Sequence, residues 1–220
     1  MFLGVFHPDE LRLHRTYNLT SSVIIRNLEA SSDFVAYFYF DFKDIRKQNS
    51  AALLSSLLVQ LSNKSVQFYE ALRGLYSEHG NGFEKPNDAS LIRCLKGMLT
   101  NSEKPIYIVM DALDECPVMD DKNIGVSTPR EKVLALLKEL VELRLPNLRL
   151  CVTSRLEFDI STVLEPLTSH QLSLHDESGQ KEDIRAYVTH TVLSDRRMKT
   201  WQDEKKDLVI NSLTEKAGGM

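Results

Sequence analysis

Three short segments of this sequence are apolar at nearly every position, and they constrain the fold more than any other feature. They are residues 34–42, 106–110 and 148–152. Segments of this length that are apolar on both faces are typical of strands covered by helices on both sides. A weaker strand is expected over 171–174, and helical patterns fill much of the remaining chain: 18–30, 50–61, 65–77, 88–99, 130–143, 183–193 and 205–216. The alternation predicts an α/β fold, a parallel sheet with helices on both faces.

The composition excludes several classes of function. The chain has 27 basic and 31 acidic residues, and its net charge of −4 gives no basic excess to bind nucleic-acid phosphates. No apolar run approaches the roughly 20 residues that a membrane-spanning helix needs. The cysteines Cys94, Cys116 and Cys151 are an odd number without a C-x-x-C pair. This disfavours a disulfide framework or a cysteine zinc site and predicts a reducing, cytoplasmic location.

Each of the three strands ends in polar residues, which are the candidate site residues. They are Asp41 and Asp44 after the first strand, Asp111, Asp114 and Glu115 after the second, and Thr153, Ser154 and Arg155 after the third. In a parallel sheet the carboxyl ends of the strands lie at one edge, where ligands bind. One carboxylate there can hold Mg²⁺ through its waters, and another can polarise a water that attacks a phosphate. Arginine matches the geometry of that phosphate.

The same residues also have a purely structural interpretation. An Asp-x-x-Asp-Glu sequence after a strand often caps the following helix. Thr153 and Ser154 can simply end a strand, and Arg155 can form an exposed ion pair that contributes little to stability. Taken singly, the residues leave both interpretations open, whereas their combination in this order favours a functional site.

The segments 35–44, 106–116 and 148–155 together resemble the NACHT-type domain of the STAND group of P-loop NTPases. The version they resemble is called the nephrocystin-3-like N-terminal domain and is expanded in filamentous fungi. Segments 171–174, 183–188 and 216–220 also resemble the family, so that the likeness extends over about residues 19–220.

The resemblance implies a three-layer αβα P-loop NTPase-like fold with a parallel sheet, and it assigns roles to the strand-end residues. Asp111 is the magnesium-side carboxylate of the Walker B motif. Asp114 and Glu115 are the acidic pair nearest the hydrolytic water. Thr153, Ser154 and Arg155 form a sensor-like segment that contacts the nucleotide.

The family also demands a phosphate loop, which this sequence does not contain. A P-loop NTPase has G-x-x-x-x-G-K-[ST] between its first strand and first helix, where glycines let backbone N–H groups surround the phosphates. Counted back from the first predicted helix, the Gly-Lys-Ser/Thr positions fall on Arg15, Thr16 and Tyr17. The only glycine among the first 73 residues is Gly4, and no lysine precedes Lys43. The loop is therefore absent or degraded, or it is encoded upstream.

These features predict the organisation of the chain. The family's first strand lies inside the sheet beside 148–152, so its loss leaves a gap there or residues 1–6 fill the position. We expect 1–18 to be a degenerate or non-native segment and 19–176 to be a NACHT-like core without its phosphate loop. Residues 177–220 begin a C-terminal helical subdomain. The sheet is then truncated at its first strand, and the chain ends before the repeats, such as ankyrin or WD40, of its relatives.

Three functions remain open. The first is a signalling or protein-interaction scaffold with vestigial Walker B acids, no cofactor and no effective nucleotide binding, whose partners are proteins or further copies, not nucleic acid or membrane. The alternative is a switch that hydrolyses ATP or GTP and binds Mg-ATP, with an unconventional phosphate site at Arg15 and Thr16 or with a loop encoded upstream. The third is an interaction domain in which residues 37–42 offer an exposed sheet edge to a partner.

Overall fold

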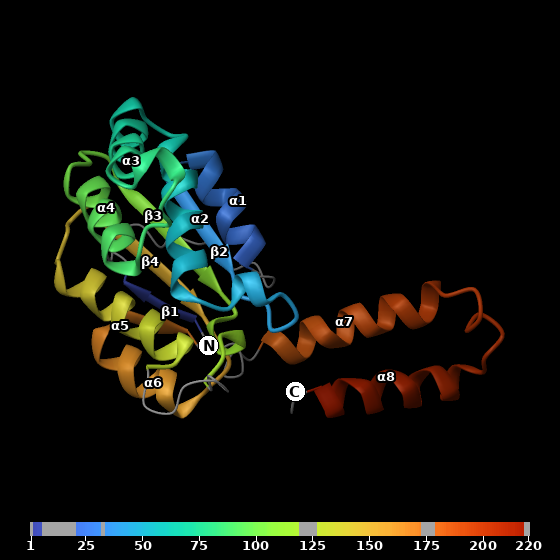
Figure 1. Cartoon of the computed structure of the whole chain (residues 1–220). Helices are drawn as coiled ribbons and strands as arrows, with labels where there is room; N and C mark the ends of the chain where they lie inside the picture. The colour runs from blue at the N-terminus through green and yellow to red at the C-terminus, as the bar shows by residue number, and fades with distance from the viewer. Residues whose placement is uncertain (1, 6–20, 32–33, 119–126, 173–178, 218–220) are drawn as a thin grey trace. The chain divides into compact units, whose positions relative to one another are not determined.

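A computed structural model describes residues 2–5, 21–31, 34–118, 127–172 and 179–217 (Figure 1). It confirms the α/β fold, with one five-stranded sheet in the order β2-β3-β4-β1-β5. The strands are β1 (Phe2–Val5), β2 (Val35–Tyr39), β3 (Ile106–Asp111), β4 (Leu148–Thr153) and β5 (His170–Leu172). The α-helices are α1 (Ser21–Ser31), α2 (Ser50–Ser62), α3 (Val66–Glu78), α4 (Asp88–Thr100), α5 (Pro129–Glu142), α6 (Phe158–Leu164), α7 (Gly179–Ser194) and α8 (Asp203–Ala217). Short 3-10 helices are η1 (Ile45–Lys47), η2 (Gly80–Gly82), η3 (Leu113–Glu115) and η4 (Glu165–Leu167).

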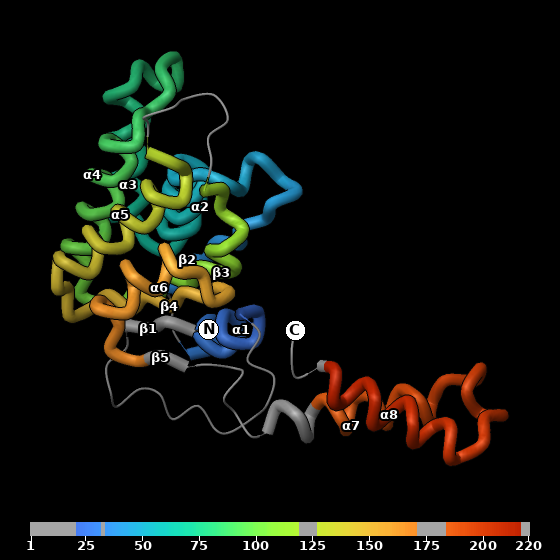
Figure 2. Tube along the Cα trace, turned by 90° about the horizontal axis from the view of Figure 1, so that it is seen from below, coloured from blue at the N-terminus to red at the C-terminus, as the bar shows by residue number. Residues whose placement is uncertain are grey.

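Alternate residues of the central strands pack against two different layers of helices. In β3, Ile108 and Met110 belong to the large core formed with α2–α6, whereas Val109 packs with Ile24 and Ile25 of α1. Strands β2 and β4 alternate in the same way. Figure 2 shows α1 on one side of the sheet and α2–α6 on the other. The expected three-layer αβα architecture is thereby confirmed, and the both-sided burial explains why these strands are apolar throughout.

Polar residues define where four of the core helices begin. Asn49, Ser65, Asn87 and Thr128 precede α2, α3, α4 and α5, and each side chain accepts a hydrogen bond from a backbone N–H of the first turn. Thr128 also forms a capping box with Glu131. Such caps contribute about 1 kcal/mol each. They fix the helix ends and hence the positions of the loops between helix and strand.

Strand β1 fills the sheet position beside β4, where the family's first strand is expected. Of the two outcomes foreseen for this position, filling is the one observed, by residues 2–5 of the segment 1–6. β1 runs antiparallel to β4, with Phe2 paired to Thr153 and Val5 to Leu150, and it is also antiparallel to β5. The sheet is therefore parallel over β2, β3 and β4 but reversed at β1, which distinguishes it from the parallel sheet of the expected fold.

Strand β2 forms one edge of the sheet, but a side chain covers the centre of that edge. The carboxamide of Gln60 in α2 accepts a hydrogen bond from the Tyr37 N–H at 3.0 Å and donates one to the Tyr37 carbonyl at 2.7 Å. Gln60 thus satisfies the two backbone groups that a partner strand would need there. This disfavours the hypothesis that 37–42 offer a sheet edge to another protein.

Helices α7 and α8 form a second compact unit, separate from the unit that contains the sheet. Val192 and Ile210 are buried between them. Among the described residues, the sheet-containing unit extends to Leu172, and α7 of the second unit begins at Gly179. Among the helices that the structure describes, none combines the length and the apolarity needed to cross a bilayer.

Candidate functional site at the strand ends

The carboxylate of Asp111 is the centre of the site. Asp111 ends β3 and Thr153 ends β4, one residue beyond the paired Met110 and Val152, so parallel pairing places them side by side. The Thr153 hydroxyl donates to Asp111 Oδ1 at 2.5 Å. The hydroxyl of Ser21, the first residue of α1, donates to the same oxygen. Ser21 and Thr153 are both buried, so this carboxylate oxygen is shared by two hydroxyls that are shielded from water.

A strained turn carries the chain from Asp111 to the acidic pair. Ala112 has φ 55° and ψ 48°, a left-handed conformation that costs a residue with a Cβ about 1–2 kcal/mol. Its N–H donates to the Thr153 hydroxyl oxygen at 3.0 Å, and the next residue, Leu113, is fully buried. These contacts hold the turn in place and direct η3, with Asp114 and Glu115, along the edge of the sheet.

Asp114 and Arg155 contact one another. The Asp114 carboxylate accepts the backbone N–H of Arg155 at 3.0 Å and forms an ion pair with Arg155 Nε at 3.4 Å. The Asp114 side chain is 9% exposed and that of Arg155 is 81% exposed. Ser154 is buried, and its hydroxyl donates to the Arg155 carbonyl at 2.7 Å. In this arrangement Asp114 anchors the segment after β4.

Glu115 connects the segment after β2 to this network. Its carboxylate accepts the backbone N–H of Phe42 at 3.1 Å, in the segment that follows β2. Asp41 and Asp44, the acids after β2, are used locally: Asp41 accepts the N–H of Lys43, and Asp44 caps η1 and pairs with Arg46. The structure therefore brings Asp111, Asp114, Glu115 and the 153–155 segment together but keeps Asp41 and Asp44 in their own turn.

Arg130 is a central residue of this region that the sequence analysis missed. It lies at the second position of α5 and is 6% exposed. Its guanidinium donates to the carbonyls of Asp114 at 2.5 Å and Cys116 at 2.8 Å and forms an ion pair with Asp159 at 3.2 Å. One signal was present in the sequence, because a cation in the first turn opposes the helix dipole and needs other partners.

Ser21 was also missed, because counting from the family pattern placed the hydroxyl of the phosphate loop at position 17. Ser21 lies four residues later in the sequence. The serine pair Ser21–Ser22 at the start of the expected helix was the available signal. The alternative phosphate ligands Arg15 and Thr16 lie outside the described residues.

The charge of Asp111 affects its neighbours. Burial, reinforced by this negative charge, raises the pKa of the Cys151 thiol to about 12. Burial and then the charge of Asp111 also raise the pKa of the Tyr39 hydroxyl. The pKa of Cys116 rises to about 11 through burial, against the opposing effect of Arg130. Both buried thiols are thus protonated at neutral pH and unsuited to nucleophilic catalysis.

The arrangement fits a bound Mg-nucleotide only in part. A serine hydroxyl beside an acidic strand end is a pair that can serve Mg²⁺. The phosphate side does not fit, because Gly4 is paired within β1 to Cys151 and His170 and cannot contribute to a loop. Among the described residues, no three His, Cys, Asp or Glu side chains are grouped to hold a metal ion. We therefore derive no chemical step through a nucleotide.

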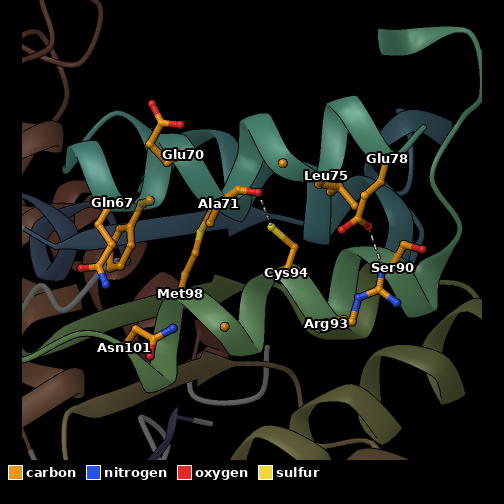
Figure 3. A pocket seen from close by; sticks show the side chains of 13 residues that line it. Gln67, Glu70, Ala71, Leu75, Glu78, Ser90, Arg93, Cys94, Met98 and Asn101 are labelled. Carbon is orange, nitrogen blue, oxygen red and sulfur yellow. Dashed lines mark hydrogen bonds and ion pairs between the residues drawn. The ribbon is translucent and has the colours of Figure 1, made fainter. Parts of the chain in front are cut away.

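A cavity of about 200 Å³ lies away from these strand ends, between α3 and α4 (Figure 3). Cys94 and Met98 of α4 project into it, and Cys94 Sγ lies 3.6 Å from the carbonyl of Ala71 on α3. Gly74 and Gly97, one on each helix, have no atom within 4 Å of a Cβ placed on them. This cavity is a gap in helix packing and not an extension of the strand-end site.

Comparison with known proteins identifies the family. The family model described as Nephrocystin 3, N-terminal matches residues 18–155, which is more than half of the chain. No curated protein and no solved structure matches the sequence at a significant level. The matched range contains α1, β2, β3, β4 and all the strand-end residues described above. The chain therefore belongs to the Nephrocystin 3 N-terminal family.

Proposed function

We propose that this chain is a degenerate NACHT-type domain of the STAND group that acts in the cytoplasm as a signalling or protein-interaction scaffold without effective nucleotide binding. The observation that carries the proposal is the direction of β1. A phosphate loop leaves the carboxyl end of a strand and enters the next helix at the same edge of the sheet. Here the amino end of β1 lies at the edge that contains Asp111, since Phe2 is paired with Thr153.

The position of the other end of β1 supports the same conclusion. Val5 is paired with Leu150, three residues before Thr153 along β4. At about 3.3 Å per residue, this places the carboxyl end of β1 roughly 10 Å from the strand ends. Helix α1, in contrast, begins with Ser21, whose hydroxyl contacts Asp111 at the strand ends. The two elements that would have to flank a phosphate loop therefore meet different edges of the sheet.

The acids of the site have structural partners that account for them without a ligand. Asp111 accepts two hydroxyls, Asp114 holds Arg155, and Glu115 accepts the N–H of Phe42. Together they join the ends of β2, β3 and β4. Buried polar groups with partners stabilise a fold, and the same groups left unpaired cost about 1–3 kcal/mol each. We therefore assign these vestigial Walker B acids to maintaining a rigid scaffold.

Isothermal titration calorimetry of the full chain with Mg-ATP and Mg-GTP tests the proposal. We expect no saturable binding up to millimolar nucleotide. Micromolar affinity that disappears in the Asp111→Asn variant would overturn it. Asp44→Asn serves as a matched control, because Asp44 follows β2 but lies outside the strand-end network. Circular dichroism of each variant separates loss of binding from loss of the fold.

One observation favours the alternative, a switch that hydrolyses ATP or GTP with Mg²⁺. The Ser21 hydroxyl and the Asp111 carboxylate form a pair that can hold Mg²⁺ next to a helix N-terminus. On this alternative, Ser21→Ala abolishes phosphate release from Mg-ATP. On the scaffold proposal, the wild-type chain releases phosphate from Mg-ATP no faster than buffer alone does. Ser21→Ala then changes only the free energy of unfolding.

A further inference from the structure

Helix α3 presents an apolar stripe on the side that faces away from the core. Val66, Tyr69, Arg73 and Tyr76 follow the i, i+3, i+7, i+10 spacing of one helix face. Val66 is 79% exposed, and Tyr69 and Tyr76 are 54% and 55% exposed. The opposite face of α3 packs against the core, because it carries the buried Phe68. We name the four residues Val66, Tyr69, Arg73 and Tyr76 the α3 stripe.

One aromatic ring of the stripe is held in place by the η2 turn. Gly82 has φ +93°, and a Cβ at this position would lie 2.8 Å from Cε2 of Tyr76. Only glycine therefore allows the backbone to approach the ring this closely. The ring is half exposed yet supported from behind, which lowers the entropy lost when it becomes an interface contact.

The stripe has one charged residue, and its counter-ion lies on the same helix. Arg73 forms an ion pair with Glu70 at 2.9 Å, with side chains 62% and 47% exposed. Because Glu70 neutralises Arg73, an acidic partner is not required. The planar guanidinium can still stack on an aromatic face. The stripe itself supplies such faces in Tyr69 and Tyr76, so it contains both halves of a cation–π contact.

We propose that the α3 stripe binds the same stripe of a second copy of this chain, with the two α3 helices antiparallel. In a heptad numbering of α3, Val66 and Arg73 occupy a positions, and Tyr69 and Tyr76 occupy d positions. An antiparallel copy places positions of different type side by side, so that each arginine lies against a tyrosine of the other copy. A parallel copy would pair arginine with arginine and tyrosine with tyrosine, so that no Arg73 would face a tyrosine ring of the other copy.

This inference rests on the proposed scaffold function, since it names the partner as a second copy and locates the contact. The contact surface is distinct from the strand-end site and from the cavity between α3 and α4. None of the four stripe residues lines that cavity, although Glu70, the ion-pair partner of Arg73, does. Self-association therefore does not depend on whether Asp111 binds a ligand.

Sedimentation equilibrium of the full chain tests the proposal. We expect a concentration-dependent dimer for the wild type. Arg73→Glu should weaken it about tenfold or more, since two cation–π contacts are lost in a symmetric pair. Tyr69→Ser combined with Tyr76→Ser should give a monomer. Tyr187→Ser, which removes an exposed tyrosine on α7, is the matched control and should leave the dimer unchanged.

Several outcomes would overturn the inference. They are a wild-type monomer throughout the concentration range, stripe variants that dimerise like the wild type, or an equal loss in Tyr187→Ser. Circular dichroism shows whether each variant is folded, and Arg73→Lys, which keeps the charge, should retain part of the affinity. Nucleotide binding is measured separately by calorimetry. A monomer without nucleotide binding removes the α3 contact but not the scaffold proposal, whereas a dimer that binds Mg-ATP does the reverse.

Discussion

The two neighbours of β4 in the sheet differ in their direction and in the residues that they bring to the strand-end edge. On one side β3 is parallel and ends in Asp111, which contacts Thr153 of β4. On the other side β1 is antiparallel, and its Gly4 is paired with Cys151. The β3 side thus carries the strand-end acids, whereas on the other side an antiparallel strand occupies the position next to β4.

The difference shows that the two halves of a nucleotide-binding site depend on different physical conditions. The acids on the β3 side have hydrogen-bond partners within the protein, so folding alone gives a reason to keep them. A phosphate loop, in contrast, consists of exposed backbone N–H groups in strained conformations whose partner is the ligand. Without a ligand it contributes nothing to stability. The predictions below test whether the residues on the β3 side stabilise the fold and whether β1 contributes to the stability of the sheet.

The largest effect is expected from Arg130→Met on the β3 side. The substitution leaves the carbonyls of Asp114 and Cys116 and the carboxylate of Asp159 without their cation. We expect the free energy of unfolding to fall by about 3–5 kcal/mol, as measured by urea denaturation. Lys132→Met, on an exposed position of the same helix, should change it by less than about 0.5 kcal/mol. Equal effects of the two substitutions would contradict a structural role for Arg130.

On the β1 side, Gly4→Pro should destabilise the protein by about 3 kcal/mol. Gly4 lies in the interior of a strand that is paired on both sides, and proline removes a donor and cannot join a central ladder. Phe2→Pro is the matched control, since proline is tolerated at the first residue of a strand. Thermal unfolding of both variants measures the difference. If Gly4→Pro melts like the wild type, β1 does not contribute to the stability of the sheet. The contrast between the two sides of β4 is then wrong.

A smaller effect, about 2 kcal/mol, is expected for Asp111→Ala. The buried hydroxyls of Ser21 and Thr153 lose their shared acceptor. Asp111→Asn keeps an acceptor oxygen and should lose about half as much. Chemical denaturation without nucleotide gives both values, and Glu142→Ala, in an exposed pair on α5, should lie within about 0.5 kcal/mol of wild type. A stable Asp111→Ala variant would mean that Asp111 is kept for a ligand.

Much of the β3 side follows from the sequence, whereas β1 does not. The apolar runs at 106–110 and 148–152 predict strands covered on both faces, and their parallel pairing brings Asp111 next to Thr153. The direction of β1 is not encoded in its four residues, because either direction satisfies the same backbone groups of β4. The contacts of Ser21 and Arg130 join segments 90 and 16 residues apart. Local periodicity carries no information on such pairs.

The smallest effect concerns the pH dependence of stability through Cys151, which pairs with β1 at its backbone and lies near Asp111 at its side chain. Burial and the charge of Asp111 raise its pKa to about 12 in the folded chain, against about 8.5 for an exposed thiol. A raised pKa means that the unfolded chain loses this proton first. The stabilisation that comes from burying the neutral thiol is therefore complete below about pH 8.5 and declines as the pH rises towards 12.

We expect about 1 kcal/mol of stability to be lost between pH 8 and pH 9.5, measured as the change in the urea midpoint. The slope should fall most in Cys151→Ala and by less in Cys94→Ala, because burial also raises the pKa of the half-buried Cys94 thiol beside the α3–α4 cavity. A Cys151→Ala slope equal to that of the wild type would show that Cys151 is accessible to water in the folded chain, and hence that neither β1 nor α1 shields it.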